Sequence, residues 1–371
     1  MARPNRSRRH RRSAPTRALR LALGATAAAA LALGCDDSPT RAGGDGPPDD
    51  SSRVEPDTVT VSEVYLTERD AALDIDSPVA WRRPDGSVWL FATAKEGDVV
   101  LVHDAATGRE LRRFGGTGTG AGRLDRPNGI AVAGDLLLVV ERDNRRVQGF
   151  SLPDLEPLGT FGSDTLRRPY GIAVVETAGG LDVYITDQDE RDLPAEQLLS
   201  TRVKQFRVTR DGDALGATLV RTFGDVSGAG ALHAVETIFA DPARDRLLIA
   251  DELSRDINVY TLSGTFTGTE ISGLFQGEPE GIALYRCGNE GYWILTDQHD
   301  VRNTFHVLAR QGLTYLGAFR GAVTRNTDGV AVIEGDVGPL EAGAFFAVHD
   351  DGNIGAFAWA DVTGALGLTG C

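Results

Sequence analysis

Carboxylates recur in this chain at two kinds of position from which side chains can hold metal ions. Some stand just before short apolar runs, as Glu278 and Glu280 stand before Gly281 to Leu284. Others stand just after a second apolar run, as Asp251 and Glu252 do. Carboxylates that crowd together cannot all stay ionised without cations between them. Oxygen ligands on irregular loops suit Ca²⁺, which takes several oxygens in flexible geometry.

The pattern occurs six times. The starts of the six apolar runs carry Asp76, Asn128, Tyr170, Glu236, Glu278 with Glu280, and Asp328. The ends of the second runs carry Lys95 with Glu96, Glu141 with Arg142 and Asp143, Asp187 with Asp189, Asp251 with Glu252, Asp297 with Gln298, and Asp350 with Asp351. Successive starts lie about 42 to 66 residues apart, a period that indicates a propeller or another repeat array.

The elements that must position these residues are short strands. In the first repeat, apolar β-branched runs at Val79 to Trp81, Val88 to Thr93 and Val99 to His103 precede a fourth run ending at Phe114. Four antiparallel strands per repeat make a propeller blade. The sequence therefore predicts an all-β fold, a six-bladed β-propeller with four-stranded antiparallel blades, and a miscounted repeat would make five or seven. Thr58 to Leu66 could pair with the C-terminal blade and close the ring.

This architecture predicts where the carboxylates meet. The first two strands of a blade are antiparallel neighbours, so the start of the first and the end of the second share one rim. We expect most of the carboxylates on that rim, with those of the innermost strands aimed at the central channel. For any single acid, a solvated loop charge without a role is the simpler explanation, and the repetition is what favours a site.

The N-terminal region has the features of an export signal. The first 34 residues carry eight arginines and no acid, and Leu21 to Leu33 is an apolar run too short to span a membrane. Residues 1–34 are therefore predicted to be a signal peptide. Gly34 before Cys35 looks like a bacterial lipobox, which predicts lipidation of Cys35, with simple secretion as the alternative. Residues 35–56 are predicted to be a disordered tether and residues 57–371 the propeller.

Composition restricts the partners and the compartment. The formal net charge of -15 argues against nucleic acid and is compatible with bound cations. We expect a monomer, exported and either lipid-anchored to the bacterial cell envelope or secreted, that meets the membrane only through its anchor. In such a compartment Cys287 and Cys371 could form a disulfide, or remain two thiols. The six histidines lack zinc-site spacing, and no G-x-S-x-G motif is present.

Four ordered motifs resemble those of the β-propeller phytases, calcium-dependent phosphatases with six blades. Asp76-Ser77-Pro78-Val79-Ala80-Trp81 resembles the family's D-D-P-A-I-W, and Ala92 to Lys95 its lysine-bearing loop. Glu278 to Gly281 resembles its D-I-E-G, and Thr327 to Val330 its T-D-G-I-D. The resemblance covers roughly residues 60–362 and is best over residues 236–351.

This resemblance implies hydrolysis of phytate (myo-inositol hexakisphosphate), or a similar phosphate ester, through attack by a calcium-bound water. It implies several Ca²⁺ ions held by Asp76, Glu236, Asp251, Glu252, Glu278, Glu280, Gln298 and Asp328. It assigns catalytic roles to Glu280, Glu236 and Tyr170. It assigns the substrate phosphates to Lys95 and Arg142.

Two features leave other functions open. The third-blade loop, Asp187-Gln188-Asp189-Glu190, lacks a lysine that the family often has there, which weakens the case for phytate. The segments leading into Asn128 and Tyr170 also look like NHL repeats. The main alternative is a non-catalytic, NHL-like propeller that binds a ligand or protein and is stabilised by calcium. A propeller lactonase with one central metal is a third, although a lactone does not need the bases Lys95 and Arg142.

Overall fold

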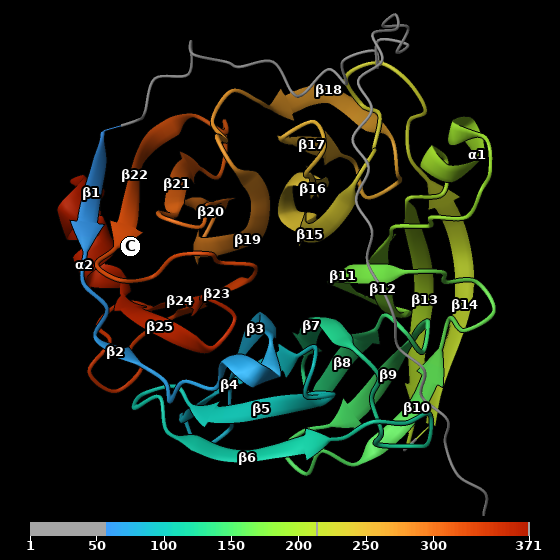
Figure 1. The fold of residues 1–371 in the computed structure, drawn as a ribbon, viewed down its shortest axis with the longest axis horizontal. Coiled ribbons are helices and arrows are strands. Elements are labelled where there is room, and N and C mark those ends of the chain that lie inside the picture. The colour runs from blue at the N-terminus through green and yellow to red at the C-terminus, as the bar shows by residue number, and fades with distance from the viewer. Residues whose placement is uncertain (1–56, 213, 370–371) are drawn as a thin grey trace, which may run out of the picture. The chain divides into compact units, whose positions relative to one another are not determined.

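Six β-sheets are arranged as a ring around a central channel (Figure 1). This arrangement is seen in a computed structural model that describes residues 57–212 and 214–369. It confirms the prediction of an all-β, six-bladed propeller. The predicted signal peptide, the lipidation site Cys35, the tether and Cys371 lie outside the described residues. None of the helices within the described ranges is long and apolar enough to cross a membrane.

The first three blades follow one another along the chain, each with its first strand at the channel and its last strand outermost. Blade 1 contains β3 (Ile75–Arg82), β4 (Val88–Ala94), β5 (Val99–Asp104) and β6 (Glu110–Gly115). Blade 2 contains β7 (Pro127–Ala133), β8 (Leu136–Glu141), β9 (Arg146–Ser151) and β10 (Pro157–Phe161). Blade 3 contains β11 (Pro169–Thr177), β12 (Gly180–Asp187), β13 (Val203–Asp211) and β14 (Ala214–Phe223).

The last three blades repeat this order. Blade 4 contains β15 (Val235–Asp241), β16 (Arg246–Asp251), β17 (Asp256–Tyr260) and β18 (Phe266–Ile271). Blade 5 contains β19 (Glu278–Cys287), β20 (Glu290–Gln298), β21 (Thr304–Ala309) and β22 (Tyr315–Gly321). Blade 6 contains β23 (Val330–Glu334), β24 (Gly343–His349) and β25 (Asn353–Ala358). The helices are α1 (Ala195–Leu199), α2 (Trp359–Leu366) and the 3₁₀ turns η1 (Ala71–Leu73) and η2 (Pro242–Arg244).

The N-terminal segment closes the ring in two steps. β2 (Tyr65–Leu66) pairs antiparallel with β25 and becomes the fourth strand of blade 6, as predicted. β1 (Thr58–Val61) instead pairs parallel with β22 and adds a fifth strand to blade 5. The predicted segment thus supplies the expected strand to the C-terminal blade and a second strand to the neighbouring blade 5. Closure of this kind leaves fewer exposed strand edges.

The core consists of six buried apolar clusters, one at each interface between neighbouring blades. Inner strands therefore pack on both faces, which explains their continuous apolar sequences. β8 reads LLLVVE and is buried at all six residues. Strands covered on both faces lack the alternation of half-exposed strands. The ring of interfaces holds the first strands, and thus the predicted rim residues, around one channel.

Candidate functional site

β-Bulges turn the predicted rim residues out of their sheets. The register of the inner strand pair shifts between Ile75 and Pro78, and again between Pro279 and Ile282. The same shift occurs in blades 2, 3 and 4. A bulge disrupts the ladder locally and re-aims a side chain. The six residues at this level are Asp76, Asn128, Tyr170, Glu236, Glu280 and Asp328. We call this ring of six, together with the charged side chains that surround it, the mouth of the channel.

Glycines just inside the mouth let neighbouring blades approach closely. A Cβ atom on Gly129 would lie 2.4 Å from the carbonyl oxygen of Tyr170, and one on Gly171 would lie 2.3 Å from that of Glu236. A Cβ atom on Gly329 would lie 2.5 Å from the carbonyl oxygen of Asp76. No side chain fits at such distances, so the glycine of the repeat follows from the packing of inner strands. This packing brings mouth residues of different blades together.

Carboxylates at the ends of second strands fix the loops that lead into the mouth. Asp251 is buried and accepts hydrogen bonds from the backbone amides of His233 (2.6 Å) and Ala234 (3.0 Å). Asp187 likewise accepts from Arg167 (2.8 Å) and Arg168 (2.6 Å). Of the two adjacent residues predicted as metal ligands, Asp251 binds backbone amides with its oxygens, and Glu252 lies with Glu236 and Glu280.

Three glutamates form the first carboxylate cluster. Glu236, Glu252 and Glu280 each offer an oxygen, and these oxygens all lie within 4.8 Å of one another. Burial, followed by the charge of Glu236, raises the pKa of Glu280 well above its usual value. Burial and the charge of Glu252 do the same for the pKa of Glu236. The charges of Asp76 and Asp328 also raise the pKa of Glu236, so the glutamates interact electrostatically with the aspartates of blades 1 and 6.

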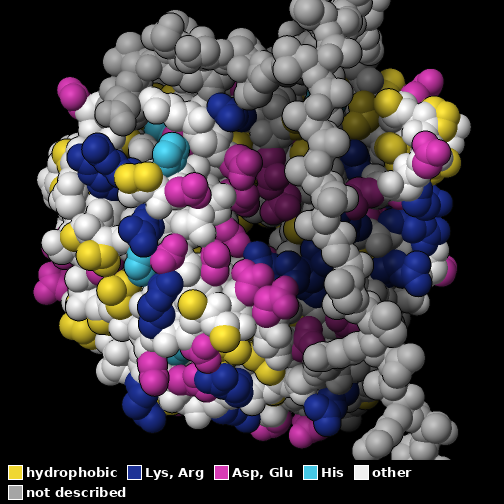
Figure 2. Space-filling model, in the orientation of Figure 1, with side chains coloured by type: hydrophobic (Ala, Val, Ile, Leu, Met, Phe, Trp, Pro, Cys, Tyr) yellow, Lys and Arg dark blue, Asp and Glu magenta, His cyan; other side chains and the backbone are white. Residues whose placement is uncertain are grey.

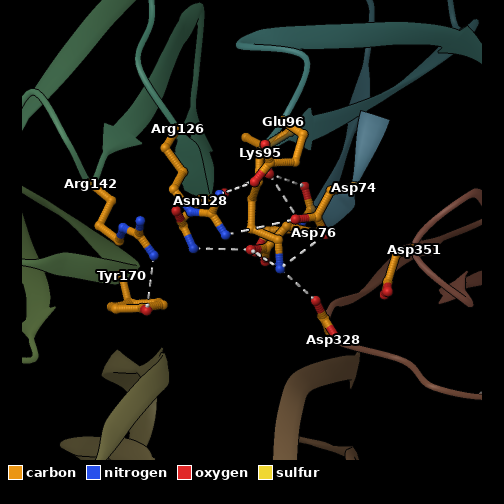
Figure 3. Close-up of polar contacts among 12 residues, drawn as sticks. Asp74, Asp76, Lys95, Glu96, Arg126, Asn128, Arg142, Tyr170, Asp328 and Asp351 are labelled. Atoms are coloured by element: carbon orange, nitrogen blue, oxygen red, sulfur yellow. Dashed lines mark hydrogen bonds and ion pairs between the residues drawn. The ribbon is translucent and has the colours of Figure 1, made fainter. Parts of the chain in front are cut away.

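The second cluster surrounds a lysine (Figure 3). Lys95 Nζ lies 2.9 Å from Asp328 Oδ2 and 3.4 Å from both Asp76 Oδ2 and Asp74 Oδ1. Asp74, Asp328 and Asp351 also bring carboxylate oxygens within 4.8 Å of one another. Burial raises the pKa of Asp328 to about 7 although Lys95 opposes the shift. One side chain thus supplies a fixed cation where aspartates of blades 1 and 6 converge.

Arginines occupy the part of the mouth that blades 2 and 3 form. The hydroxyl of Tyr170 accepts hydrogen bonds from Arg168 Nη2 (3.2 Å) and Arg142 Nη1 (3.5 Å). Arg126 forms ion pairs with Glu96 and, at 3.7 Å, with Asp74. Arg126 and Arg168 occupy equivalent positions, two residues before the mouth residue of blades 2 and 3. We call Arg126, Arg142 and Arg168 the basic half of the mouth.

The mouth is therefore divided by charge. The acid half consists of Asp74, Asp76, Glu236, Glu252, Glu280, Asp328 and Asp351, from blades 1, 4, 5 and 6. Figure 2 shows Asp and Glu side chains gathered around the hollow at the centre of one face, with Lys and Arg side chains beside them. A cavity of about 490 Å³ continues from the mouth into the channel. Its wall begins at Gly129, Gly171 and Gly329 and ends at Arg286 and Glu334 on the far rim.

The structure brings most of the predicted site residues together. Gln298 donates a hydrogen bond to Asp328, and Lys95 lies among the aspartates rather than free in the mouth. Glu278 is exposed at the edge of the acid half, with Gln298 as its register partner. Cys287 forms a disulfide, but the predicted pairing with Cys371 is untested because Cys371 lies outside the described residues.

Sequence reasoning placed Asn128 and Asp351 on the rim but gave them no role in the site, and it missed Asp74, Arg126 and Arg168. Asp74 stands two residues before Asp76, the same spacing as Glu278 before Glu280, and this repeat was a usable signal. Arg126 and Arg168 share an R-P-x-G segment that marks their equivalence. Asn128 donates to Asp76 Oδ2 at 3.0 Å, a contact across two blades that no sequence pattern indicates.

No protein-family model matches the chain, and no curated protein matches it either. Many solved structures resemble the fold, two of which serve as examples. One is a calcium-binding protein, regucalcin, from Agrobacterium tumefaciens, with 13% identity and a TM-score of 0.49 over 81% of this chain and 95% of that one. The other is a nidogen/laminin complex, with 14% identity and a TM-score of 0.43 over 68% of this chain and 82% of that one.

Proposed function

We propose that this protein is a calcium-dependent phosphomonoester hydrolase that acts on phytate or a similar phosphate ester. The observation that carries the proposal is the charge-divided mouth, with clustered carboxylates facing guanidinium groups across one channel. A phosphate ester bound through a divalent cation needs both: acids to hold the cation and bases to hold the anion. A lactonase would need only the acids.

The donor set fits calcium. Glu236, Glu252 and Glu280 provide only oxygen, and they share a small, largely buried space. Their raised pKa values express the cost of ionising all three together, a cost that a divalent cation would offset. When bound there, Ca²⁺ would polarise phosphoryl oxygens and orient a water molecule for attack on phosphorus.

The chain's own residues would divide the remaining work. Glu280 is the most buried of the three glutamates. In its ionised form, the Glu280 carboxylate would accept a proton from the attacking water. Arg142 and Arg168 would hold phosphate oxygens by charge-assisted hydrogen bonds. Tyr170 accepts hydrogen bonds from both guanidinium groups and so fixes their spacing. Lys95 would neutralise the aspartates of blades 1 and 6, and we expect it to reach a phosphate only when a cation replaces it among them.

Phosphate release by the purified protein tests this function. Phytate and a simple aryl phosphate should both be assayed, with calcium and with a chelator, at matched ionic strength. We expect release that depends on calcium and is lost with the chelator. If neither ester is hydrolysed while calcium still binds, the protein is the non-catalytic calcium-stabilised propeller instead. Release that is equal in both conditions would remove calcium from the mechanism.

A further inference from the structure

The loop that departs from the phytase pattern supplies an acid to the basic half of the mouth. Glu190, between β12 and β13, forms an ion pair with Arg168 Nη1. We propose that Glu190 is a tethered competitor at the anion site: its carboxylate holds the Arg168 guanidinium until an incoming phosphate group displaces it. This inference rests on the proposed function and concerns the regulation of the same site.

Hydrogen bonds hold Asp189 and Arg191, the residues on either side of Glu190, in place. The carboxylate of Asp189, 2% exposed, accepts hydrogen bonds from Arg191 Nη2 (2.6 Å) and Nε (2.9 Å). The carbonyl oxygen of Asp189 accepts a further bond from Arg202 Nη1 at 3.0 Å. The backbone amide of Arg191 also donates to Asp189 Oδ1 at 3.1 Å, so the backbone on both sides of Glu190 is fixed. Its side chain reaches Arg168 from a defined position, which raises its effective concentration there.

Arg168 is fixed as well. Its backbone amide donates to Asp187, and its carbonyl oxygen accepts from the amide of Gln188 at 2.9 Å. Its guanidinium lies over the ring of Tyr170, with its carbon 5.6 Å from the ring centroid, and donates to the hydroxyl. Among the described residues, Glu190 is the acid that forms an ion pair with this guanidinium. Exchange of that carboxylate for a phosphate would leave the contacts with Tyr170 in place.

The same pairing occurs along the basic half. Arg126 pairs with Glu96, Arg142 with Asp143 and Arg168 with Glu190. The arginine side chains are 24%, 18% and 33% exposed, whereas their acids are 59%, 46% and 59% exposed. In each pair the acid is therefore more exposed than the arginine, and it can leave the pair for solvent while the arginine stays in place. Exposed pairs contribute little stability, and arginine forms charge-assisted, frequently bidentate bonds with phosphate as well as with carboxylate, so a phosphate can replace the acid at little cost.

Phosphate binding by four variants tests the inference. The probe is inorganic phosphate, titrated calorimetrically into the full-length protein without calcium, with folding verified by circular dichroism. Glu190→Gln removes the competing charge, and Glu196→Gln removes the same charge from exposed helix α1 in the same segment. Arg168→Gln and Arg168→Gln with Glu190→Gln complete a double-mutant cycle. The KM for phosphate esters in calcium provides a second measurement if the calcium-free protein is unstable.

We expect Glu190→Gln to bind phosphate about two- to fivefold more tightly than the parent protein, the range set by an exposed ion pair. Glu196→Gln should leave the affinity unchanged, and Glu190→Gln should have no effect once Arg168 is replaced. An effect of Glu190→Gln no larger than that of Glu196→Gln would overturn the inference, as would a gain that survives Arg168→Gln. If the effect of Glu190→Gln on phosphate affinity depends on Arg168 but no ester is hydrolysed, the hydrolase proposal fails. The inference that Glu190 competes with phosphate for Arg168 would then still stand.

Discussion

At the scale of single residues, burial makes the two sides of the mouth do different work. Glu280 lies among glutamates, so its ionised form needs a cation, and its proposed task is in the chemical step. Arg142 is 18% exposed and reaches Tyr170, so its proposed task is to hold the substrate. Substitutions at these two positions should therefore change different kinetic constants.

We predict that Glu280→Gln lowers kcat about 100-fold or more, since metal-assisted activation of water supplies much of the rate in such sites. Arg142→Ala should chiefly raise KM. Steady-state kinetics over a range of calcium concentrations would separate them, because added calcium should partly rescue only Glu280→Gln. Glu290→Gln and Arg109→Ala, outside the mouth, are the matched controls. Unchanged constants in Arg142→Ala would mean that this arginine only pairs with Asp143.

The pKa shifts of the acid half predict a pH dependence of stability in calcium-free protein. Burial raises the folded-state pKa of Asp328 to about 7, and those of Glu236 and Glu280 are also raised. The folded protein therefore keeps protons that the unfolded chain releases above about pH 4. The contribution of these groups to the free energy of unfolding is fully present below that pH and is lost as pH rises through the folded-state values.

Chemical denaturation at several pH values would measure this effect. Without calcium, the free energy of unfolding should fall as pH rises from about 4 to 7, and saturating calcium should flatten or reverse the slope. A calcium-free protein whose stability rises over the same range would show that the carboxylates are already ionised in the folded state.

At the scale of elements, the glycines inside the mouth couple blade packing to the position of the glutamates. Gly171→Ala places a methyl group against the carbonyl oxygen of Glu236 and must push β11 and β15 apart. We predict a loss of about 1 to 3 kcal/mol in stability, as for other overpacked sites, together with weaker calcium binding. Gly364→Ala in α2, which has open space around it, is the control and should be neutral or slightly stabilising. Equal stability in the two variants would contradict this packing.

Much of the fold could be predicted from the sequence because each blade repeats one pattern. The run Gly-Ile-Ala-Val after Asn128, and again after Tyr170, marks the inner strand by its continuous apolar residues. The sequence did not indicate the separate pairing of Thr58–Val61, because parallel pairing with β22 depends on the neighbouring blade, which no local pattern encodes. The sequence also could not distinguish Asp251 from Glu252 as a ligand. These adjacent residues at a strand end face different surroundings, because Asp251 binds backbone amides and Glu252 lies in the mouth.

At the scale of the whole molecule, the N-terminal prediction places the propeller outside the cytoplasm. We predict that Cys35→Ser blocks lipidation and leaves the precursor unprocessed or the protein outside the membrane fraction. Metabolic labelling with a fatty acid, followed by membrane fractionation, would measure this. Cys287→Ser, which removes a cysteine of the propeller, is the control and should still be labelled. A Cys35→Ser protein that is processed and fractionates with membranes like its parent would refute the lipobox.

Calcium binding to the three glutamates tests the central claim most directly. Calorimetric titration of calcium into chelator-treated protein should show binding with release of protons, because the raised pKa values of Glu236 and Glu280 favour protons on the cluster until a cation enters. Repeating the titration in two buffers of different ionisation enthalpy would count those protons. The account predicts that Glu280→Gln binds calcium much more weakly than the parent protein and that Glu290→Gln keeps the parent affinity. Binding that is absent in the parent protein, or unchanged in Glu280→Gln, would contradict a calcium centre at the mouth.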